Sequence, residues 1–292
     1  DAAAKADHFL ITGDHANLWF EPRRSDTLLI TFDNLATIDE GWPRGPWLSR
    51  RLEPLGHSIL GVQSHAKDWF RQPTAPDLLR GLEARGFFRR FSRVVMIGAS
   101  MGGFAALNFA PLIPEARVLA FSPQSTMNKD IAPFEARFPF AVRKSNWKGM
   151  PFLDAAAAIP YIRKVALVYD PFVPEDATHA ARMAGPNVQL LPAPFCTHEA
   201  IRVVIKSGAL LGLVQELVAG DAVSGFWRSF RARKSVPKWQ KSLLGHAVQR
   251  GHLRLAVQAA DAILRAGEGL PAEELVFARR VRREALKQAK AG

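Results

Sequence analysis

Ser100 is the centre of a Gly-x-Ser-x-Gly segment, a pattern in which a serine hydroxyl can act as a nucleophile. Residues 94–97 before it are apolar, which predicts a strand covered on both faces, and a helix rich in small residues is predicted after it. Gly98 and Gly102 have no Cβ atoms to collide in so tight a strand-to-helix turn. The free N–H groups at the start of the helix suit a developing negative charge on a substrate oxygen. The alternative is a turn in which Ser100 only caps the helix.

This turn resembles the one that carries the nucleophile in the α/β-hydrolase superfamily, where serine, acid and histidine follow in that order along the chain. Residues 164–169 predict a second buried strand, and Asp170 at its end begins an Asp-x-x-Val-Pro sequence similar to the family's acid segment. His198 lies in a loop after a short predicted strand at residues 187–191, where the family has its general base. The resemblance implies that Asp170 orients His198. Asp176 is the competing carboxylate, and the strand-end position favours Asp170.

The order of the predicted elements indicates an α/β fold class. Strands and helices alternate along the chain after a predicted N-terminal β-hairpin, which favours a mostly parallel central sheet with helices on both faces. The resemblance implies an α/β-hydrolase catalytic domain at residues 1–224, followed by a helical extension at residues 225–292. Residues 122–160 could form a lid over the site, or a loop whose aromatic side chains simply cover the sheet.

The oxyanion hole is defined less completely than the nucleophile. In the resembling fold one donor is the backbone N–H after the nucleophile, here that of Met101. The second comes from the loop after an early strand, which the sequence predicts at residues 27–32. Here that loop begins Asp33-Asn34 and has no His-Gly pair, which speaks against a close relationship to glycine-rich lipases. The resemblance leaves the second donor open between Asp33 and Asn34.

Four aromatic side chains are candidates for a substrate pocket. Trp69 and Phe70 follow another predicted strand, at residues 58–63, so they are expected near the carboxyl edge of the sheet. Trp147 lies in the long segment between two later strands, and Phe195 lies in the loop that carries His198. Each could equally be a packing residue.

Composition narrows the class of protein further. The 292 residues are 48% hydrophobic, enough for a sizeable core, and no apolar run is long enough for a transmembrane helix. Cys196 is the only cysteine, so the chain cannot form an internal disulfide. It lies two residues before His198, but neighbouring side chains of an extended loop point in different directions, which favours a packing role for the thiol. No metal site and no cofactor are predicted, and the cytoplasm is the expected location.

The C-terminal part differs in charge from the rest of the chain. Residues 225–292 contain fifteen Lys and Arg against five Asp and Glu, so most of the net charge of +12 lies there. Apolar and small residues at helical spacing over residues 243–264 are similar to a single tetratricopeptide-like helical pair. An anionic surface or an acidic protein is the predicted partner of this segment, and a solvated linker is the alternative. No nucleic-acid fold signature accompanies the basic residues.

The residues and the resemblance together predict an enzyme that forms an acyl ester on Ser100. Water as the acceptor makes it an esterase or thioesterase acting on a small acyl ester, and this is the favoured interpretation. A sugar or lipid hydroxyl as the acceptor would make it an acyltransferase. The alternative from another class is a non-catalytic interaction protein built on a hydrolase scaffold.

Overall fold

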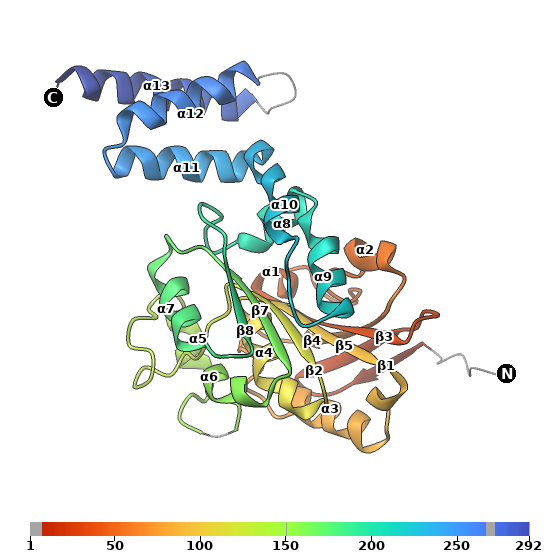
Figure 1. Ribbon diagram of the computed structural model, residues 1–292. Helices are drawn as coiled ribbons and strands as arrows, with labels where there is room; N and C mark the ends of the chain where they lie inside the picture. Colours follow the sequence, from red (N-terminus) through yellow and green to blue (C-terminus); the bar gives the residue numbers. More distant parts are fainter. Residues whose placement is uncertain (1–7, 150, 267–271, 292) are drawn as a thin grey trace.

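The computed structural model describes residues 8–149, 151–266 and 272–291, and its centre is a sheet of eight strands (Figure 1). The strands are β1 (Phe9–Thr12), β2 (Ala16–Glu21), β3 (Thr27–Phe32), β4 (Ser58–Ser64), β5 (Arg93–Ala99), β6 (Arg117–Phe121), β7 (Lys164–Tyr169) and β8 (Val188–Pro192). Their order across the sheet is β1-β2-β4-β3-β5-β6-β7-β8. β1 pairs antiparallel with β2 and β2 with β4, whereas all other neighbours are parallel.

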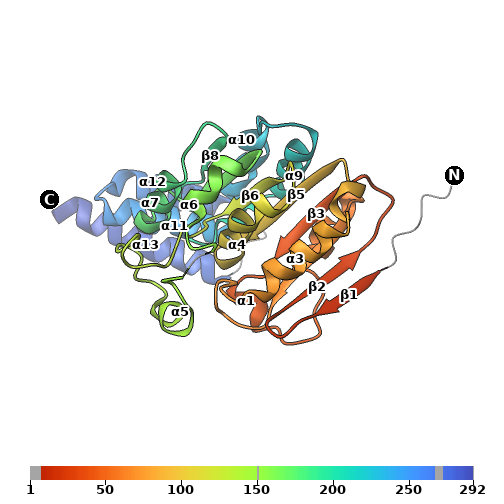
Figure 2. The ribbon, with the colours of Figure 1, turned by 90° about the horizontal axis from the view of Figure 1, so that it is seen from below.

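Helices cover both faces of this sheet because the parallel strands are apolar on both sides. In β3, Leu28 and Ile30 join the core on one face and Leu29 joins the core on the other. The first core is covered by α3 (Thr74–Ala84), α4 (Met101–Phe109) and α7 (Pro174–Arg182), and the second by α8 (Ala200–Lys206) and α9 (Ala209–Ala219). Figure 2 shows α3 lying over one face of the sheet and running roughly along the direction of the strands.

Short helices fill the connections. They are α1 (Leu35–Ile38), α2 (Ser49–Leu52), α5 (Pro139–Lys144), α6 (Ala155–Ala158) and α10 (Phe226–Ser229). The sheet order, the helices on both faces and the central position of β5 between β3 and β6 confirm the predicted fold class. The chain has the α/β-hydrolase fold, and the carboxyl ends of its parallel strands meet at one edge, where α/β proteins place their sites.

The chain after residue 224 first continues the core of the α/β unit. Phe226 and Phe230 are completely buried, and they lie in the same apolar cluster as the inward side chains of α8 and α9. Trp239, at the start of the helix α11 (Pro237–Gln249), belongs to this cluster too. The change in charge near residue 224 therefore does not coincide with the end of this core.

Three helices form the C-terminal bundle, which includes the region where the spacing predicts a helical pair. α11 packs with α12 (Leu253–Arg265) and α13 (Ala272–Ala291), beyond the end of the sheet in Figure 1. Their shared core is small and contains two alanines, which allow a close approach of the helices. It consists of Leu244, Ala260, Ile263, Ala278 and Val281. Among the described residues, no helix combines the length and the apolar composition that a membrane crossing requires.

Candidate active site

Ser100 occupies the turn between β5 and α4 with a strained backbone, at φ +50° and ψ −116°. Only glycine fits at the positions two residues before and two residues after it. A Cβ atom on Gly98 would collide with the Gly102 carbonyl, and one on Gly102 would lie 2.6 Å from the carbonyl oxygen of Asp33. The two glycines therefore allow the tight turn predicted from the sequence. This turn places Ser100, with its strained backbone, at the carboxyl edge of the sheet.

His198 reaches this serine from the loop after β8. Its Nε2 lies 2.9 Å from the Ser100 Oγ, and its side chain is about one quarter exposed, at 25%. The loop contains two further residues with positive φ, Phe195 at +65° and Thr197 at +61°. The structure therefore joins Ser100 and His198 as the sequence predicts, although 98 positions separate them.

The carboxylate beside His198 is that of Asp176, not that of Asp170. Asp176 lies in the first turn of α7, and its two oxygens are 2.9 Å and 3.0 Å from the His198 Nδ1. The Asp170 carboxylate instead accepts N–H groups from Phe172, at 2.9 Å, and from Thr197, at 2.7 Å. The prediction that Asp170 contacts His198 is wrong, because the oxygens at the strand end are already used to fasten the two loops around them.

The C-terminal helix α11 packs directly on the histidine loop. The Trp239 indole N–H donates to the Pro194 carbonyl at 2.8 Å, and the Phe195 ring lies against those of Trp239 and Phe172. The Lys238 ammonium pairs with the Glu199 carboxylate, next to His198 in the chain. Phe195 thus faces the C-terminal helices, although the sequence proposed it for the substrate pocket.

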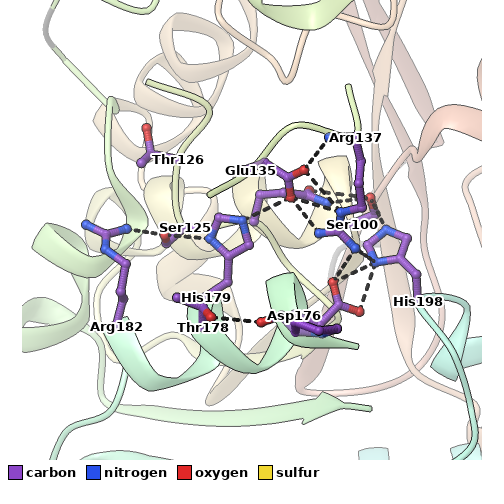
Figure 3. Close-up of polar contacts among 12 residues, drawn as sticks. Ser100, Ser125, Thr126, Glu135, Arg137, Asp176, Thr178, His179, Arg182 and His198 are labelled. Atoms are coloured by element: carbon purple, nitrogen blue, oxygen red, sulfur yellow. Dashed lines mark hydrogen bonds and ion pairs between the residues drawn. The ribbon is translucent and has the colours of Figure 1, made fainter. Parts of the chain in front are cut away.

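A charged network extends from Asp176 into the protein (Figure 3). The Arg137 guanidinium donates to Asp176 at 2.8 Å, and the same nitrogen lies 3.3 Å from the His198 Nδ1. Arg137 also donates to both oxygens of Glu135, at 2.5–3.1 Å. The Glu135 carboxylate accepts the Nε2–H of His179 at 3.1 Å. The sequence analysis missed these three residues; the available signal was an acid and a base two positions apart in an otherwise apolar segment.

The tautomer of His179 follows from its neighbours. Its Nδ1 accepts the backbone N–H of Ser125 at 3.1 Å, so Nε2 carries the proton that Glu135 accepts. Burial lowers the pKa of His179, which keeps the ring neutral. Burial alone would raise the pKa of Glu135, but the hydrogen bonds from His179 and Arg137 outweigh it and lower the pKa to about 2. The network thus holds two carboxylates, one guanidinium and one neutral imidazole.

Replacing Glu135 by glutamine is expected to lower the free energy of unfolding at pH 7 by about 3 kcal/mol, because a pKa held at about 2 instead of 4.5 stabilises the fold above pH 4.5. This stabilisation is lost as the pH falls from 4.5 towards 2, where the carboxylate becomes protonated. Urea denaturation at pH 7, 4.5 and 3 measures the effect, and the difference between variant and wild type should shrink at each step.

The matched control for this measurement is Glu115→Gln, which removes an exposed carboxylate paired with Arg163. Exposed pairs contribute little, so this variant should unfold almost like the wild type at every pH. Equal stability of the Glu135 and Glu115 variants at pH 7 would contradict the structural role of the network.

Both predicted loop donors of the oxyanion hole already donate elsewhere. The Asp33 N–H donates to the Val62 carbonyl at 3.1 Å, and the Asn34 N–H donates to the Thr37 hydroxyl at 2.8 Å. The prediction that Asp33 or Asn34 supplies a free N–H therefore disagrees with the structure. Met101 is the first residue of α4, where the N–H has no carbonyl one turn earlier in the helix to bind.

Of the other predicted pocket residues, only Trp69 lies near the catalytic centre. Its indole N–H donates to Gln124, which contacts Ser100. Phe70 packs in the core against Phe32 and Phe109. Trp147 packs against the Phe104 ring and donates to the Ala141 carbonyl at 3.1 Å. Phe70 and Trp147 are packing residues.

Part of the segment 122–160, predicted as a lid or a covering loop, lies beside His198. Phe138 from this segment lies with its ring centroid 5.9 Å from that of His198 and 5.2 Å from that of Trp69. Arg71 ties the segment down by donating to a row of its carbonyl groups. These belong to Asn146 at 3.0 Å, Gly149 at 2.8 Å, Pro151 at 3.0 Å and Phe152.

The Cys196 thiol is unsuited to be the nucleophile. It is completely buried, and burial together with the nearby charge of Asp170 raises its pKa to about 12. A thiol attacks as the thiolate, so a cysteine in this state is inert. Cys196 is a packing residue, as the sequence favours.

Comparisons with known proteins add a likeness of shape. No protein-family model matches the chain, and no curated protein matches it in sequence. The solved structures that resemble it include Est1E from Butyrivibrio proteoclasticus, at TM-score 0.47 and 14% identity over 74% of this chain and 100% of that one. The Pyrococcus furiosus esterase Pf2001 has TM-score 0.46 and 17% identity over 73% and 91%. The capsule O-acetyltransferase of Neisseria meningitidis serogroup A has TM-score 0.42 and 9% identity over 68% and 93%.

Proposed function

We propose that this protein is a serine hydrolase of the α/β-hydrolase superfamily, which cleaves a carboxylic ester or thioester through an acyl-enzyme on Ser100. The observation that supports this most strongly is the hydrogen-bonded chain from Ser100 through His198 to Asp176, with 2.9 Å at each link. The backbone of Ser100 is strained, at the edge of the sheet. This argues against a serine that only caps a helix, because capping requires no such strain.

The proposed reaction has two steps. The Ser100 Oγ attacks the substrate carbonyl carbon while His198 takes the hydroxyl proton and passes it to the leaving alcohol or thiol, which breaks the substrate's ester bond. Water then attacks the acyl-enzyme, His198 takes a proton from it and returns that proton to Ser100, and the carboxylic acid leaves. The Met101 N–H donates to the oxyanion in both steps.

The charge of the site matches this mechanism. Two carboxylates, Glu135 and Asp176, share the single positive charge of Arg137, which leaves one negative charge at rest. The imidazolium formed at His198 during the reaction neutralises it. Asp176 is almost fully buried, with a side chain 1% exposed, so water screens the attraction between its carboxylate and the imidazolium only weakly.

The experiment is a substrate profile of the purified full chain over p-nitrophenyl esters of increasing acyl length and over acyl-thioesters. Stoichiometric fluorophosphonate labelling of Ser100 together with release of free acid is the expected result. The same assay with added sugar or fatty alcohol tests the alternative acceptors, because acyl transfer gives a new ester in place of free acid. An unlabelled wild-type protein without turnover of any ester would overturn the proposal and favour a non-catalytic scaffold.

A further inference from the structure

Gln124 contacts the nucleophile on a side that the catalytic triad does not use. It follows β6, it is completely buried, and its Nε2 lies 3.2 Å from the Ser100 Oγ. Its other amide atom, Oε1, lies 3.1 Å from the indole Nε1 of Trp69 and 3.4 Å from the Ser100 Oγ. A buried primary amide is thus placed between the ring of Trp69 and the reactive oxygen.

The chemistry of the neighbours fixes the direction of each hydrogen bond. An indole N–H can only donate, so the amide oxygen of Gln124 accepts from Trp69. The Gln124 NH₂ group lies 3.2 Å from the Ser100 Oγ, nearer than the amide oxygen, and it can donate to this hydroxyl. The Nδ1 of His198 faces the Asp176 carboxylate, so its Nε2 is the acceptor for the serine O–H. The serine has a single hydrogen, which goes to the His198 Nε2 at 2.9 Å rather than to the Gln124 oxygen at 3.4 Å. The Ser100 hydroxyl therefore donates to His198 and accepts from the Gln124 NH₂ group.

Trp69 is itself held in a costly conformation. Trp69 and Phe70 have φ values of +55° and +53°, a region that side chains with a Cβ rarely adopt. The Asp68 carboxylate stabilises this turn by accepting the Phe70 N–H at 3.0 Å, and the rings of Phe138 and Phe140 pack against the indole. Strain of this kind persists only where the surroundings impose it. In this conformation the indole N–H points at the Gln124 side chain.

We propose that Gln124 is a fourth catalytic side chain, which holds the Ser100 oxygen in the rotamer that faces His198, and that Trp69 is the residue that positions Gln124. This inference rests on the proposed serine hydrolase function. Because the Ser100 hydroxyl donates to His198 and accepts from Gln124, its orientation is fixed before substrate binds. The entropy cost of orienting it is then not part of the activation barrier. The role concerns the chemical step rather than substrate binding.

The test compares kcat and KM of four single variants and one double variant on the best ester of the profile. Gln124→Met keeps the length of the side chain without its N–H groups and should lower kcat roughly 10- to 100-fold with little change in KM. Gln124→Leu also removes the N–H groups and cannot donate in any protonation state, so it should lower kcat as well and covers the case in which Gln124→Met does not fold. Trp69→Phe frees the amide to turn and should lower kcat by roughly 3- to 10-fold.

Trp147→Phe is the matched control, because it makes the same change at a buried tryptophan whose N–H donates to the Ala141 carbonyl. It should leave kcat unchanged. In the double variant, Trp69→Phe should add nothing to Gln124→Met if it acts only through the amide. An unchanged kcat in a folded Gln124 variant, or additive losses in the double variant, would overturn the assignment.

Failure of the proposed function gives a different pattern from failure of this inference. If the wild type neither turns over esters nor reacts with a fluorophosphonate, both proposals fall together. If the wild type reacts and the Gln124 variants are labelled at the wild-type rate, the serine hydrolase stands and the role of Gln124 is refuted.

Discussion

Replacing Ser100 by alanine is expected to abolish fluorophosphonate labelling and to lower kcat by about 10⁶-fold, because the covalent route disappears with the hydroxyl. Turnover should not fall to zero, since binding and the oxyanion donors alone give about 10³- to 10⁴-fold acceleration over water. Intact-protein mass spectrometry measures the labelling, and an ester assay measures the residual rate.

The control for this variant is Cys196→Ala, which removes the other nucleophilic side chain near His198. It should be labelled like the wild type, because the thiol is buried and its pKa lies at about 12. Undiminished labelling of Ser100→Ala would show that another residue reacts with the probe, and the assignment of Ser100 would have to be abandoned.

Replacing Asp176 by asparagine is expected to lower kcat by about 10⁴-fold while the fold stays intact. The amide would favour the wrong tautomer of His198, and it cannot stabilise the imidazolium as a carboxylate does. It would also leave Arg137 with Glu135 as its remaining carboxylate partner. Steady-state kinetics across the pH range and a circular dichroism spectrum provide the comparison.

Asp170→Asn is the matched control for Asp176, since it makes the same isosteric change six positions earlier. Its carboxylate fastens the N–H groups of Phe172 and Thr197, so its loss should reduce thermal stability more than catalysis. A kcat loss at Asp170 that exceeds the loss at Asp176 would contradict the geometry and restore the choice made from the sequence.

The fold and the turn around Ser100 could be predicted because their signals are local. Apolar runs such as residues 94–97 predict buried strands wherever they occur, and two glycines around a serine are required by the turn itself. His198 was predicted from its place in the order of elements, which the α/β fold fixes. The contact between Ser100 and His198 follows from that order.

The acid and the oxyanion donors could not be predicted, because they depend on how separate segments meet. Asp170 and Asp176 both follow β7, and only the direction of α7 decides which carboxylate reaches His198. The Asp33 N–H is taken up by a hydrogen bond to β4, and the Asn34 N–H is taken up by the cap of α1. Neither hydrogen bond can be predicted from the loop sequence alone. Gln124 gave no signal at all, since a single amide in a loop has no characteristic spacing.

The basic C-terminal helices are predicted to bind an anionic surface or an acidic protein, and no observation tests this prediction. Four cationic side chains of α13 are exposed on the side of the helix opposite its buried alanines, where an anionic partner would find them. They are Arg279, Arg280, Arg283 and Lys287. Binding of this bundle to an anionic surface or an acidic protein stays a prediction.

The packing of α11 on the histidine loop has a consequence for the order in which the candidate site is completed. A ribosome produces the chain from its N-terminus, so the turn around Ser100 and the loop around His198 are synthesised before Trp239 and Lys238. Until α11 has been synthesised, the strained backbone at Phe195 and Thr197 lacks the helix that packs on it. A nascent chain thus contains the turn around Ser100 before the loop of His198 is packed, and translation must reach the C-terminal helices before these contacts are complete.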